Sequence, residues 1–264
     1  MSDERKPFLD PKEGESLPEK TVSQQAMTRL SLAADAIGAT KRAIAHQGNQ
    51  VPSLLATNMN SQYRLKVMRT KAAWEYTPEA QDLAYQHKEA DVAAKADIAH
   101  GGNCGEHAWV AYHYLRQHGA GQPINRVAPT YIDHAFVIIG DLKKDADNEM
   151  AVSDPWTNNP TACLWEDHFS HGPRKDVESQ ASMIADGNSY KSAIAAGLKL
   201  SAYGEQMVKQ ADSDEETKDK TDNWKANHFW QQDNTTAKDA KFDYKAEQPA
   251  KAQPESEGAQ PEQH

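Results

Sequence analysis

Three stretches of the sequence decide the fold: GGNCGEHAWVAYHYL at residues 101–115, DHAFVIIGD at residues 133–141 and AVSDPW at residues 151–156. The first stretch opens on two glycines and continues with apolar residues at helical spacing, which predicts a helix over residues 104–117. The other two are short apolar runs that predict strands over residues 131–139 and 149–153. A polar loop joins these strands, so we expect them to pair antiparallel. The predicted fold class is α+β, with the helix packed on a small antiparallel sheet.

Helix signals also occur outside these stretches. Thr21 and Gln24 fit a capping box, which predicts a helix that starts there and has Gly48 as its C-terminal glycine. Thr77 directly before Pro78 is typical of a helix N-terminus. Further helices are predicted over residues 63–74, from residue 77 toward residue 98, and near residues 179–185 and 189–203, and Gly119 is predicted to end the helix that begins at residue 104.

Charge and hydropathy exclude several classes of protein. The chain has 29 basic and 39 acidic residues, a net charge of −10, which argues against a nucleic-acid partner. Its apolar runs stay well short of the roughly 18 residues that a membrane helix needs. The charged N-terminus, MSDERKPFLDPKEG, has no apolar core of a Sec-type signal peptide. The two cysteines, Cys104 and Cys163, cannot form a disulfide framework and favour a reducing compartment, and Cys163 is expected to be an inert buried thiol.

Cys104 is the candidate nucleophile because it follows a Gly-Gly-Asn turn and opens a helix. Backbone N–H groups at a helix N-terminus lower the pKa of a thiol there, and the thiolate is the form that attacks a carbonyl. The same turn can direct backbone donors toward an oxyanion. In the first turn, Glu106 is expected to interact favourably with the helix dipole and His107 to face solvent. The alternative for Cys104 is a buried structural cysteine, and the sequence weighs the two about evenly.

His134 and Asp154 lie near the ends of the two predicted strands that we expect to face each other. Strand parity puts His134 on the same face as alternate apolar residues of its strand, and Asp154 on the same face as those of the other strand. Opposed side chains have Cβ atoms roughly 4.5–5.5 Å apart, close enough for a carboxylate to orient an imidazole. Antiparallel pairing around Lys144 would match Phe136 with Val152, Ile138 with Met150 and His134 with Asp154.

The order Cys–His–Asp, with the Cys at a helix start and the other two on neighbouring strands, resembles the papain-like and transglutaminase-like cysteine enzymes. GNCGEHA is similar to their Cys-bearing helix start, DHAFVIIG to their His-bearing strand and VSDPW to the strand end with the Asp. The resemblance covers about residues 100–156 and is closest to compact bacterial versions, including effector and toxin proteases and glutamine deamidases. It implies a papain-like fold in which Cys104 is the nucleophile, His134 the general base and acid, and Asp154 the orienting carboxylate.

One feature of the papain type is missing from this sequence. Papain-type enzymes carry a Gln several residues before the Cys as an oxyanion donor, and residues 98–103 contain none. Asn103, His100 or the backbone N–H of Cys104 is predicted to take its place. Trp156, directly after Asp-Pro, is predicted to shield the triad, because a drier site strengthens the contact between imidazole and carboxylate. The aromatic residues Trp109, Tyr112 and Tyr114 can line a substrate groove, although a place in the core is the commoner role for such residues.

The chemistry implied by the resemblance is acyl transfer at an amide carbonyl, with a protein or peptide as substrate. A thiol protease is the first prediction, and the same triad fits a glutamine deamidase or a transglutaminase. No cofactor and no metal are predicted, because Cys104 with His107, or His168 with His171, supplies only half of a zinc site. The other class is a non-enzymatic interaction protein whose helices scaffold a partner.

Composition divides the chain into three parts. A polar N-terminal arm at residues 1–20 is predicted to be disordered, residues 21–204 to form the catalytic domain, and residues 205–264 to be an acidic, low-complexity, largely disordered tail. The tail contains an aromatic segment, WKANHFW at residues 224–230, that can dock on the domain or on a partner. The resemblance to effectors implies a bacterial cytoplasmic protein that a secretion apparatus, with or without a chaperone, delivers into a target cell without a Sec signal.

Overall fold

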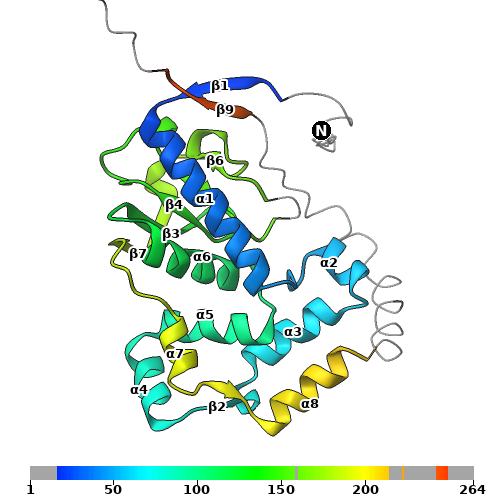
Figure 1. The fold of residues 1–264 in the computed structure, drawn as a ribbon. Coiled ribbons are helices and arrows are strands. Elements are labelled where there is room, and N and C mark those ends of the chain that lie inside the picture. Colours follow the sequence, from blue (N-terminus) through cyan, green and yellow to red (C-terminus); the bar gives the residue numbers. More distant parts are fainter. Residues whose placement is uncertain (1–16, 158–159, 214–221, 223–241, 249–264) are drawn as a thin grey trace, which may run out of the picture.

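The computed structural model describes residues 17–157, 160–213, 222 and 242–248 (Figure 1). These residues form eight α-helices and nine β-strands, so the predicted α+β class is confirmed. The sequence predictions for residues 1–16 and for the aromatic segment 224–230 lie outside the described residues. The helices are α1 (Gln24–Ala43), α2 (Val51–Ala56), α3 (Asn60–Arg69), α4 (Pro78–Gln86), α5 (Lys88–Ala99), α6 (Cys104–His118), α7 (Lys191–Ala195) and α8 (Ala202–Ala211).

The main sheet is antiparallel throughout and has five strands in the order β6-β5-β4-β3-β7. Strand β1 pairs with β9 in parallel, and β2 pairs with β8 antiparallel. The strands are β1 (Glu19–Val22), β2 (Trp74–Glu75), β3 (Pro123–Pro129), β4 (Phe136–Ile139), β5 (Ala151–Ser153), β6 (Cys163–Leu164), β7 (Val177–Ile184), β8 (Lys199–Leu200) and β9 (Asp243–Ala246).

Helices α1 and α6 cover one face of the main sheet (Figure 1). Val137 and Ile139 of β4 pack on this side, in the same buried cluster as residues of both helices. Phe136 and Ile138 lie in a second buried cluster, together with Trp165, on the other side of the sheet. The alternation predicted for this strand is therefore confirmed, because successive side chains of a strand point to opposite faces.

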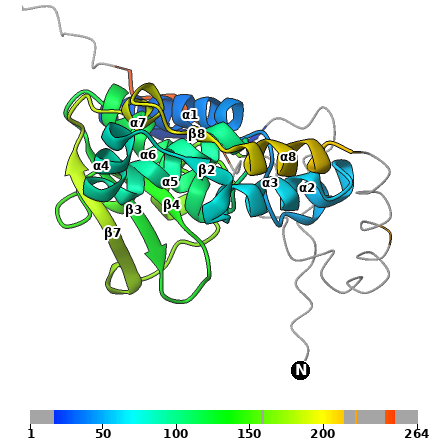
Figure 2. The same ribbon diagram turned by 90° about the horizontal axis from the view of Figure 1, so that it is seen from below.

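A second core lies among the helices. It is built around the alanine-rich face of α5, against which α3, α4 and α7 pack, and α8 packs on α3. Seen from below, α2, α3 and α8 lie at the end of the molecule away from β7 (Figure 2). Helix α6 packs against α5 as well as against the sheet, so it joins the two cores. Helix α6 is therefore flanked by the helical core on one side and by the sheet on another.

The predicted strand register is wrong by two residues. Ile138 pairs with Val152, whereas Met150 was its predicted partner. A short 3-10 helix, Asp147–Glu149, follows the loop, so β5 begins only at Ala151. A shift of two residues leaves every side chain on its predicted face, whereas a shift of one would have reversed them all.

Several predicted element boundaries also differ. The first helix begins after Ser23, whose side chain accepts a hydrogen bond from the backbone of Ala26, because Thr21 is part of β1. It ends at Ala43, so Gly48 is not its C-terminal glycine. Strand β4 does not begin until Phe136, later than the predicted start of its strand.

The predicted helix starting at Thr77 does start there, and the Thr77 hydroxyl accepts a hydrogen bond from the backbone of Ala80. It is split in two at His87, whose backbone leaves the helical region, so α4 and α5 replace one long helix. Gly119 is the C-cap of α6, as predicted. The remaining helix boundaries differ too: α3 ends at Arg69, and residues 189–203 contain α7, β8 and the start of α8.

The prediction of a helix near residues 179–185 is wrong, because these residues belong mostly to strand β7. The sequence VESQASMI has only two β-branched residues and a mostly exposed surface, so its periodicity is weak. Pairing with β3, which the sequence did not predict, decides its conformation.

The described structure extends beyond both ends of the predicted domain 21–204. Helix α8 crosses residue 204 and continues to Ala211, and β9 lies within the stretch predicted to be largely disordered. The β9 residue Tyr244 donates a hydrogen bond to Asp167 at 2.8 Å and accepts one from the backbone of Leu164 at 3.2 Å. This part of the tail is therefore attached to the β6 end of the sheet.

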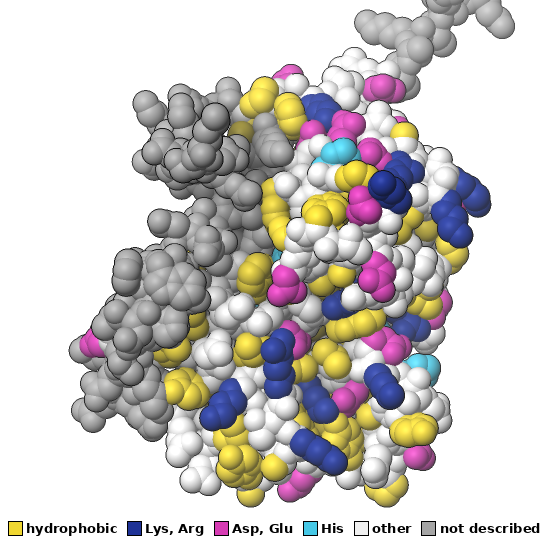
Figure 3. All heavy atoms as spheres, turned by 180° about the vertical axis from the view of Figure 1, so that it is seen from behind, with side chains coloured by type: hydrophobic (Ala, Val, Ile, Leu, Met, Phe, Trp, Pro, Cys, Tyr) yellow, Lys and Arg dark blue, Asp and Glu magenta, His cyan; other side chains and the backbone are white. Residues whose placement is uncertain are grey.

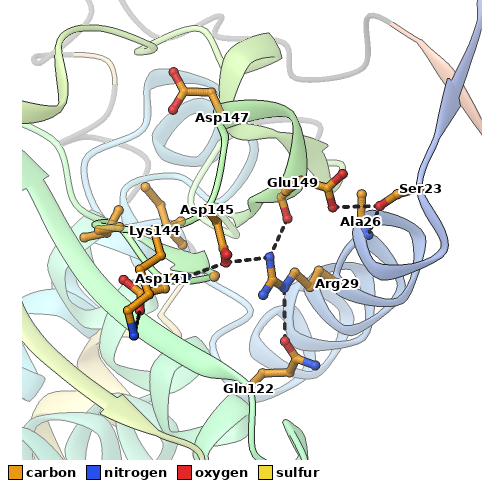
Figure 4. Close-up of polar contacts among 12 residues, drawn as sticks. Ser23, Ala26, Arg29, Gln122, Asp141, Lys144, Asp145, Asp147 and Glu149 are labelled. Carbon is orange, nitrogen blue, oxygen red and sulfur yellow. Dashed lines mark hydrogen bonds and ion pairs between the residues drawn. The ribbon is translucent and has the colours of Figure 1, made fainter.

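A buried arginine ties α1 to the connection between β4 and β5 (Figure 4). Arg29 is 2% exposed and forms an ion pair of 2.8 Å with Asp145. The guanidinium also donates to the backbone carbonyl of Glu149 at 2.7 Å and to the side chain of Gln122 at 3.0 Å. These contacts fix the segment that immediately precedes β5, and thereby the strand that leads to Asp154.

Replacing Arg29 with Met is expected to lower the free energy of unfolding by about 1–3 kcal/mol, because the carboxylate of Asp145 and the carbonyl of Glu149 would lose the group that donates to them. Urea unfolding followed by circular dichroism measures this loss. Arg42→Met changes an exposed arginine of the same helix and is expected to cost no more than about 0.5 kcal/mol. Equal losses in the two variants would contradict a special role for the Arg29 contacts.

Candidate active site

The backbone just before α6 packs closely against α3 and α6, and this packing fixes where α6 starts. His100 ends α5 in the left-handed conformation, with φ at 54°, and two glycines follow. A Cβ atom on Gly101 would lie 2.5 Å from the Cβ of Arg64, and one on Gly102 would lie 2.5 Å from the Cβ of Glu106. Glycine is therefore required at both positions for the chain to turn into α6 where it does.

Asn103, the predicted oxyanion donor, is the N-cap of α6. Its backbone N–H donates to the carboxylate of Glu106 at 2.8 Å, and its side-chain oxygen accepts a hydrogen bond of 3.1 Å from the backbone of Asn49. The side chain thus has a structural role, at the edge of the cleft described below. His100, the other predicted donor, bonds to the carbonyl of Ala43 at 2.9 Å and is not among the residues that line the cleft.

His134 and Asp154 are in direct contact, with 2.6 Å between the imidazole Nε2 and the carboxylate Oδ2. His134 is 4% exposed and Asp154 1%, so the contact is shielded from water. His134 lies two residues before β4, and Asp154 directly follows β5. The two strands bring them together even though the residues are not paired across the sheet.

Cys104 lies beside His134: both line the same cleft, and the thiol is near enough to influence the imidazole. Nδ1 of His134 is buried and has no hydrogen-bond partner among the described residues. Because Nε2 donates its hydrogen to Asp154, the other ring nitrogen, Nδ1, is the one left to exchange a proton with a thiol. Cys104 is partly exposed, whereas Cys163 is buried, as predicted. The structure therefore brings together the three residues that the sequence analysis selected.

The electrostatics of the pair favour its charged form. Burial is the largest influence on the pKa of His134 and lowers it, but the charge of Asp154 and the hydrogen bond to it outweigh burial, so the pKa is raised above the usual 6.5. Burial likewise raises the pKa of Asp154, but His134 holds it well below the usual 3.8. At neutral pH the imidazolium is thus stabilised next to Cys104.

A second histidine contacts the same carboxylate and was missed as a site residue in the sequence analysis. Nε2 of His168 lies 3.4 Å from Oδ2 of Asp154. Nδ1 of His168 contacts the hydroxyl of Ser170 at 2.8 Å and accepts a hydrogen bond of 3.4 Å from its backbone N–H, so Nε2 is the ring nitrogen that faces Asp154. His168 was considered only as half of a zinc site with His171, which instead pairs with Asp147 at 2.8 Å. The signal that could have identified it is the apolar strand that precedes it in the sequence.

The residues described here contain no group of three or more His, Cys, Asp or Glu side chains arranged to hold a metal ion.

Trp156 lies next to the imidazole, with 5.3 Å between its ring centroid and that of His134. Its backbone carbonyl accepts hydrogen bonds from the side chains of Gln47 at 3.0 Å and Gln50 at 3.3 Å. Phe169 lies on the ring as well, with centroids 5.5 Å apart. Aromatic rings therefore surround the imidazole, in the position predicted for Trp156.

The site opens into a cleft of about 490 Å³. Cys104 and His134 line it, whereas Asp154 lies beneath the surface. The remaining lining residues are Asn49, Arg69, Asn103, Gly105, Arg126, Ala128, Pro129, Thr130, Ile132, Asp133, Ala135, Trp156, Glu178 and Gln180. A cleft of this size can admit a small molecule or a short stretch of peptide.

Arg126 is the other functional candidate that the sequence analysis missed. It lies on β3 and is 7% exposed, with its guanidinium 4.2 Å from the ring centroid of Trp109. Nη2 donates to the backbone carbonyl of Gly105 at 3.3 Å. Burial lowers the pKa of Arg126 to about 10, although the nearby Cys104 and Glu106 act to raise it. It was missed because β3 itself was not predicted.

The prediction that His107 faces solvent is wrong. Its ring is fully buried, and Nδ1 lies 2.9 Å from the carbonyl oxygen of Asn103. Burial lowers its pKa to about 3, with a further contribution from Lys41, so the ring is neutral. The reason is that α6 packs on both α5 and the sheet, which leaves little of its first turn exposed.

Comparison of the chain with protein-family models, with curated proteins and with solved structures finds no match. Within the described part of the chain, no helix is both long enough and apolar enough to cross a bilayer. On the face of the molecule in Figure 3, acidic and basic side chains are interspersed and do not gather by sign.

Replacing Asp154 with Asn is expected to destabilise the protein most between about pH 4 and 6.5. The stability due to Asp154 is present above its usual pKa and is lost as the pH falls through its lowered value. The stability due to His134 is present below its usual pKa and is lost as the pH rises through its raised value. Within that window the loss should be about 3–5 kcal/mol, measured by urea unfolding from pH 3 to 10.

His134→Gln removes the other partner of the pair, so it should destabilise the protein most over the same pH range. His171→Gln is the control, because the pair of His171 with Asp147 is partly exposed and should contribute much less. A stability difference for Asp154→Asn that stays constant across the pH range would contradict a buried ion pair.

Proposed function

We propose that this chain is a cysteine-dependent acyl-transfer enzyme that acts on amide bonds in proteins, as a thiol protease. The observation that carries the proposal is the 2.6 Å contact between His134 and Asp154, beside the partly exposed Cys104 at the start of α6. The resemblance of the three motifs to papain-like and transglutaminase-like enzymes supports it. Under this proposal the helix–sheet arrangement is a papain-like one.

In the first half of the reaction, the thiolate of Cys104 attacks the carbonyl carbon of the amide. The tetrahedral intermediate collapses as the imidazolium of His134 gives its proton to the leaving amine, which departs and leaves a thioester on Cys104. In the second half, a water molecule transfers a proton to His134 and attacks the thioester. The products are a carboxylic acid and the restored thiolate–imidazolium pair.

Asp154 keeps the imidazole in the orientation and tautomer that this sequence of proton transfers requires. The oxyanion is best served by the backbone N–H of Cys104 at the helix N-terminus. The side-chain N–H₂ of Asn103 is a second candidate donor, because only the oxygen of that amide is engaged by Asn49. Trp156 and the other rings around His134 keep water from competing for the His134–Asp154 contact. The resemblance to bacterial effector and toxin enzymes extends the proposal to a protein delivered into a target cell.

Incubation of the full chain with denatured casein, followed by intact-mass analysis, tests the reaction. Wild type is expected to produce casein fragments, and Cys104→Ala to produce none, because the nucleophile is absent. Cys163→Ala, which removes the other thiol from the core, is the control that should retain cleavage. Mass gains of about 1 Da per site without fragments would replace the protease with a glutamine deamidase. Intact, unmodified casein would contradict the proposed activity.

Alkylation by iodoacetamide tests the pair of Cys104 and His134 without a substrate. At pH 6, Cys104 of His134→Gln is expected to react about tenfold more slowly than in wild type, because the neighbouring cation that stabilises its thiolate is lost. Peptide mass spectrometry assigns the label to Cys104 or Cys163. Equal, slow labelling of both thiols in wild type would favour a scaffold protein without catalysis.

A further inference from the structure

A second hollow, of about 640 Å³, adjoins the cleft that contains Cys104. The two hollows share Gln180, and Trp109 of the second is covered by Arg126 of the first. The second hollow lies between α6, which contributes Trp109, Tyr112 and Arg116, and β7, which contributes residues 180–183. The two hollows therefore make a groove that starts at Cys104 and continues beside α6.

One wall of this groove is the outer edge of β7. Residues 180–183 all line the second hollow. Since successive side chains of a strand point to opposite faces, a hollow that touches four consecutive residues lies along the strand's edge. Among the described strands β7 is the last of its sheet, with β3 as its sole neighbour. An open strand edge is the surface to which an extended peptide can add.

A β-bulge lies where the two hollows meet. Arg126 pairs with Ala181 and the next residue, Val127, pairs with Ser179, so Gln180 has no partner across the strand pair. Bulges bend the strand and redirect side chains, and they are common beside functional sites. Here the bulge brings Gln180 to both hollows and lies directly beside Arg126.

Arg126 is a buried cation whose hydrogen-bonding capacity is mostly unused. Nε is buried without an acceptor, and among the described residues the carbonyl of Gly105 is the one group to which the guanidinium donates a hydrogen bond. No carboxylate of the described residues lies within ion-pair distance of it. By contrast, Arg69, the other arginine of the cleft, donates to both carboxylate oxygens of Glu106 and so already has a counter-ion. A buried guanidinium without a counter-ion is costly, and its planar fork fits a carboxylate.

We propose that Arg126 determines substrate specificity by binding a carboxylate side chain of an extended peptide that lies in this groove. This inference rests on the proposed function and names its substrate class: a polypeptide with Asp or Glu close to the amide attacked by Cys104. Proximity supports this placement, because Arg126 contacts Gly105, the residue next to Cys104. The guanidinium provides the charge complement, and the edge of β7 provides backbone partners for the rest of the peptide.

Two small alkylating reagents test the carboxylate site. Iodoacetate and iodoacetamide both form a bond between carbon and the Cys104 sulfur as iodide leaves, but only iodoacetate carries a carboxylate. In wild type, the ratio of the iodoacetate rate to the iodoacetamide rate is expected to be about tenfold higher than in Arg126→Gln. Because both reagents need the thiolate, the ratio does not depend on how much of Cys104 is ionised.

The variants separate the possible outcomes. Arg126→Lys retains the charge without the fork and should give an intermediate ratio. Arg42→Gln, which alters an exposed arginine of α1 that lines neither hollow, should keep the wild-type ratio. If the two rates fall together in Arg126→Gln, Arg126 merely stabilises the thiolate, and the proposal is overturned. An unchanged ratio in that variant overturns it as well.

Protection of Cys104 from labelling in the wild-type chain tests whether the groove binds an acidic peptide. This measurement remains informative even if Arg126→Gln fails to fold. Pools of acetylated hexapeptides with Glu fixed at one position are expected to slow labelling of Cys104 by iodoacetamide, whereas the pools with Gln at that position should not. Alternating N-methylation of the peptide backbone should abolish protection, because it blocks pairing with β7. Equal protection by Glu and Gln pools would overturn the specificity while leaving the enzyme intact. Selective protection without casein cleavage would leave the binding site intact and refute the enzyme.

Discussion

The contact between His134 and Asp154 is the interaction on which the candidate site depends. Two groups of opposite charge lie 2.6 Å apart and are almost fully buried, and neither could be buried alone at acceptable cost. Several parts of the fold maintain the contact. The pairing of β4 with β5 brings the two residues near each other, and Gln47 and Gln50 hold the loop that follows Asp154. His168 contacts the same carboxylate oxygen as His134.

The third member of the site comes from a different layer of the molecule. Cys104 reaches the imidazole because α6 packs on β3 and β4, with its N-terminus near the start of β4. The two glycines before α6 let the backbone approach α3 and α6 more closely than any other residue would allow. The distance from thiol to imidazole is therefore set by helix–sheet packing, whereas the distance from imidazole to carboxylate is set within the sheet.

Local patterns predicted those parts of the structure that depend on neighbouring residues. The faces of β4, the N-cap at Thr77 and the C-cap at Gly119 follow from periodicity and capping, and all three agree with the structure. The register was wrong by two residues because a 3-10 helix takes up part of the loop, a detail that strand periodicity does not report. The prediction of a helix within β7 failed because a half-exposed edge strand has little pattern of its own.

The sequence by itself determined the kinds of side chain in the site, the start of α6 at Cys104 and the end of β5 before Asp154, because capping and strand alternation act over a few residues. Only the tertiary structure decided that Arg126 would lie over Trp109 beside Gly105, that His168 would share Asp154 with His134, and that His107 would be buried. These contacts join residues from separate layers or loops of the fold. Their formation depends on how helices and strands pack, and no local pattern of residues encodes that arrangement.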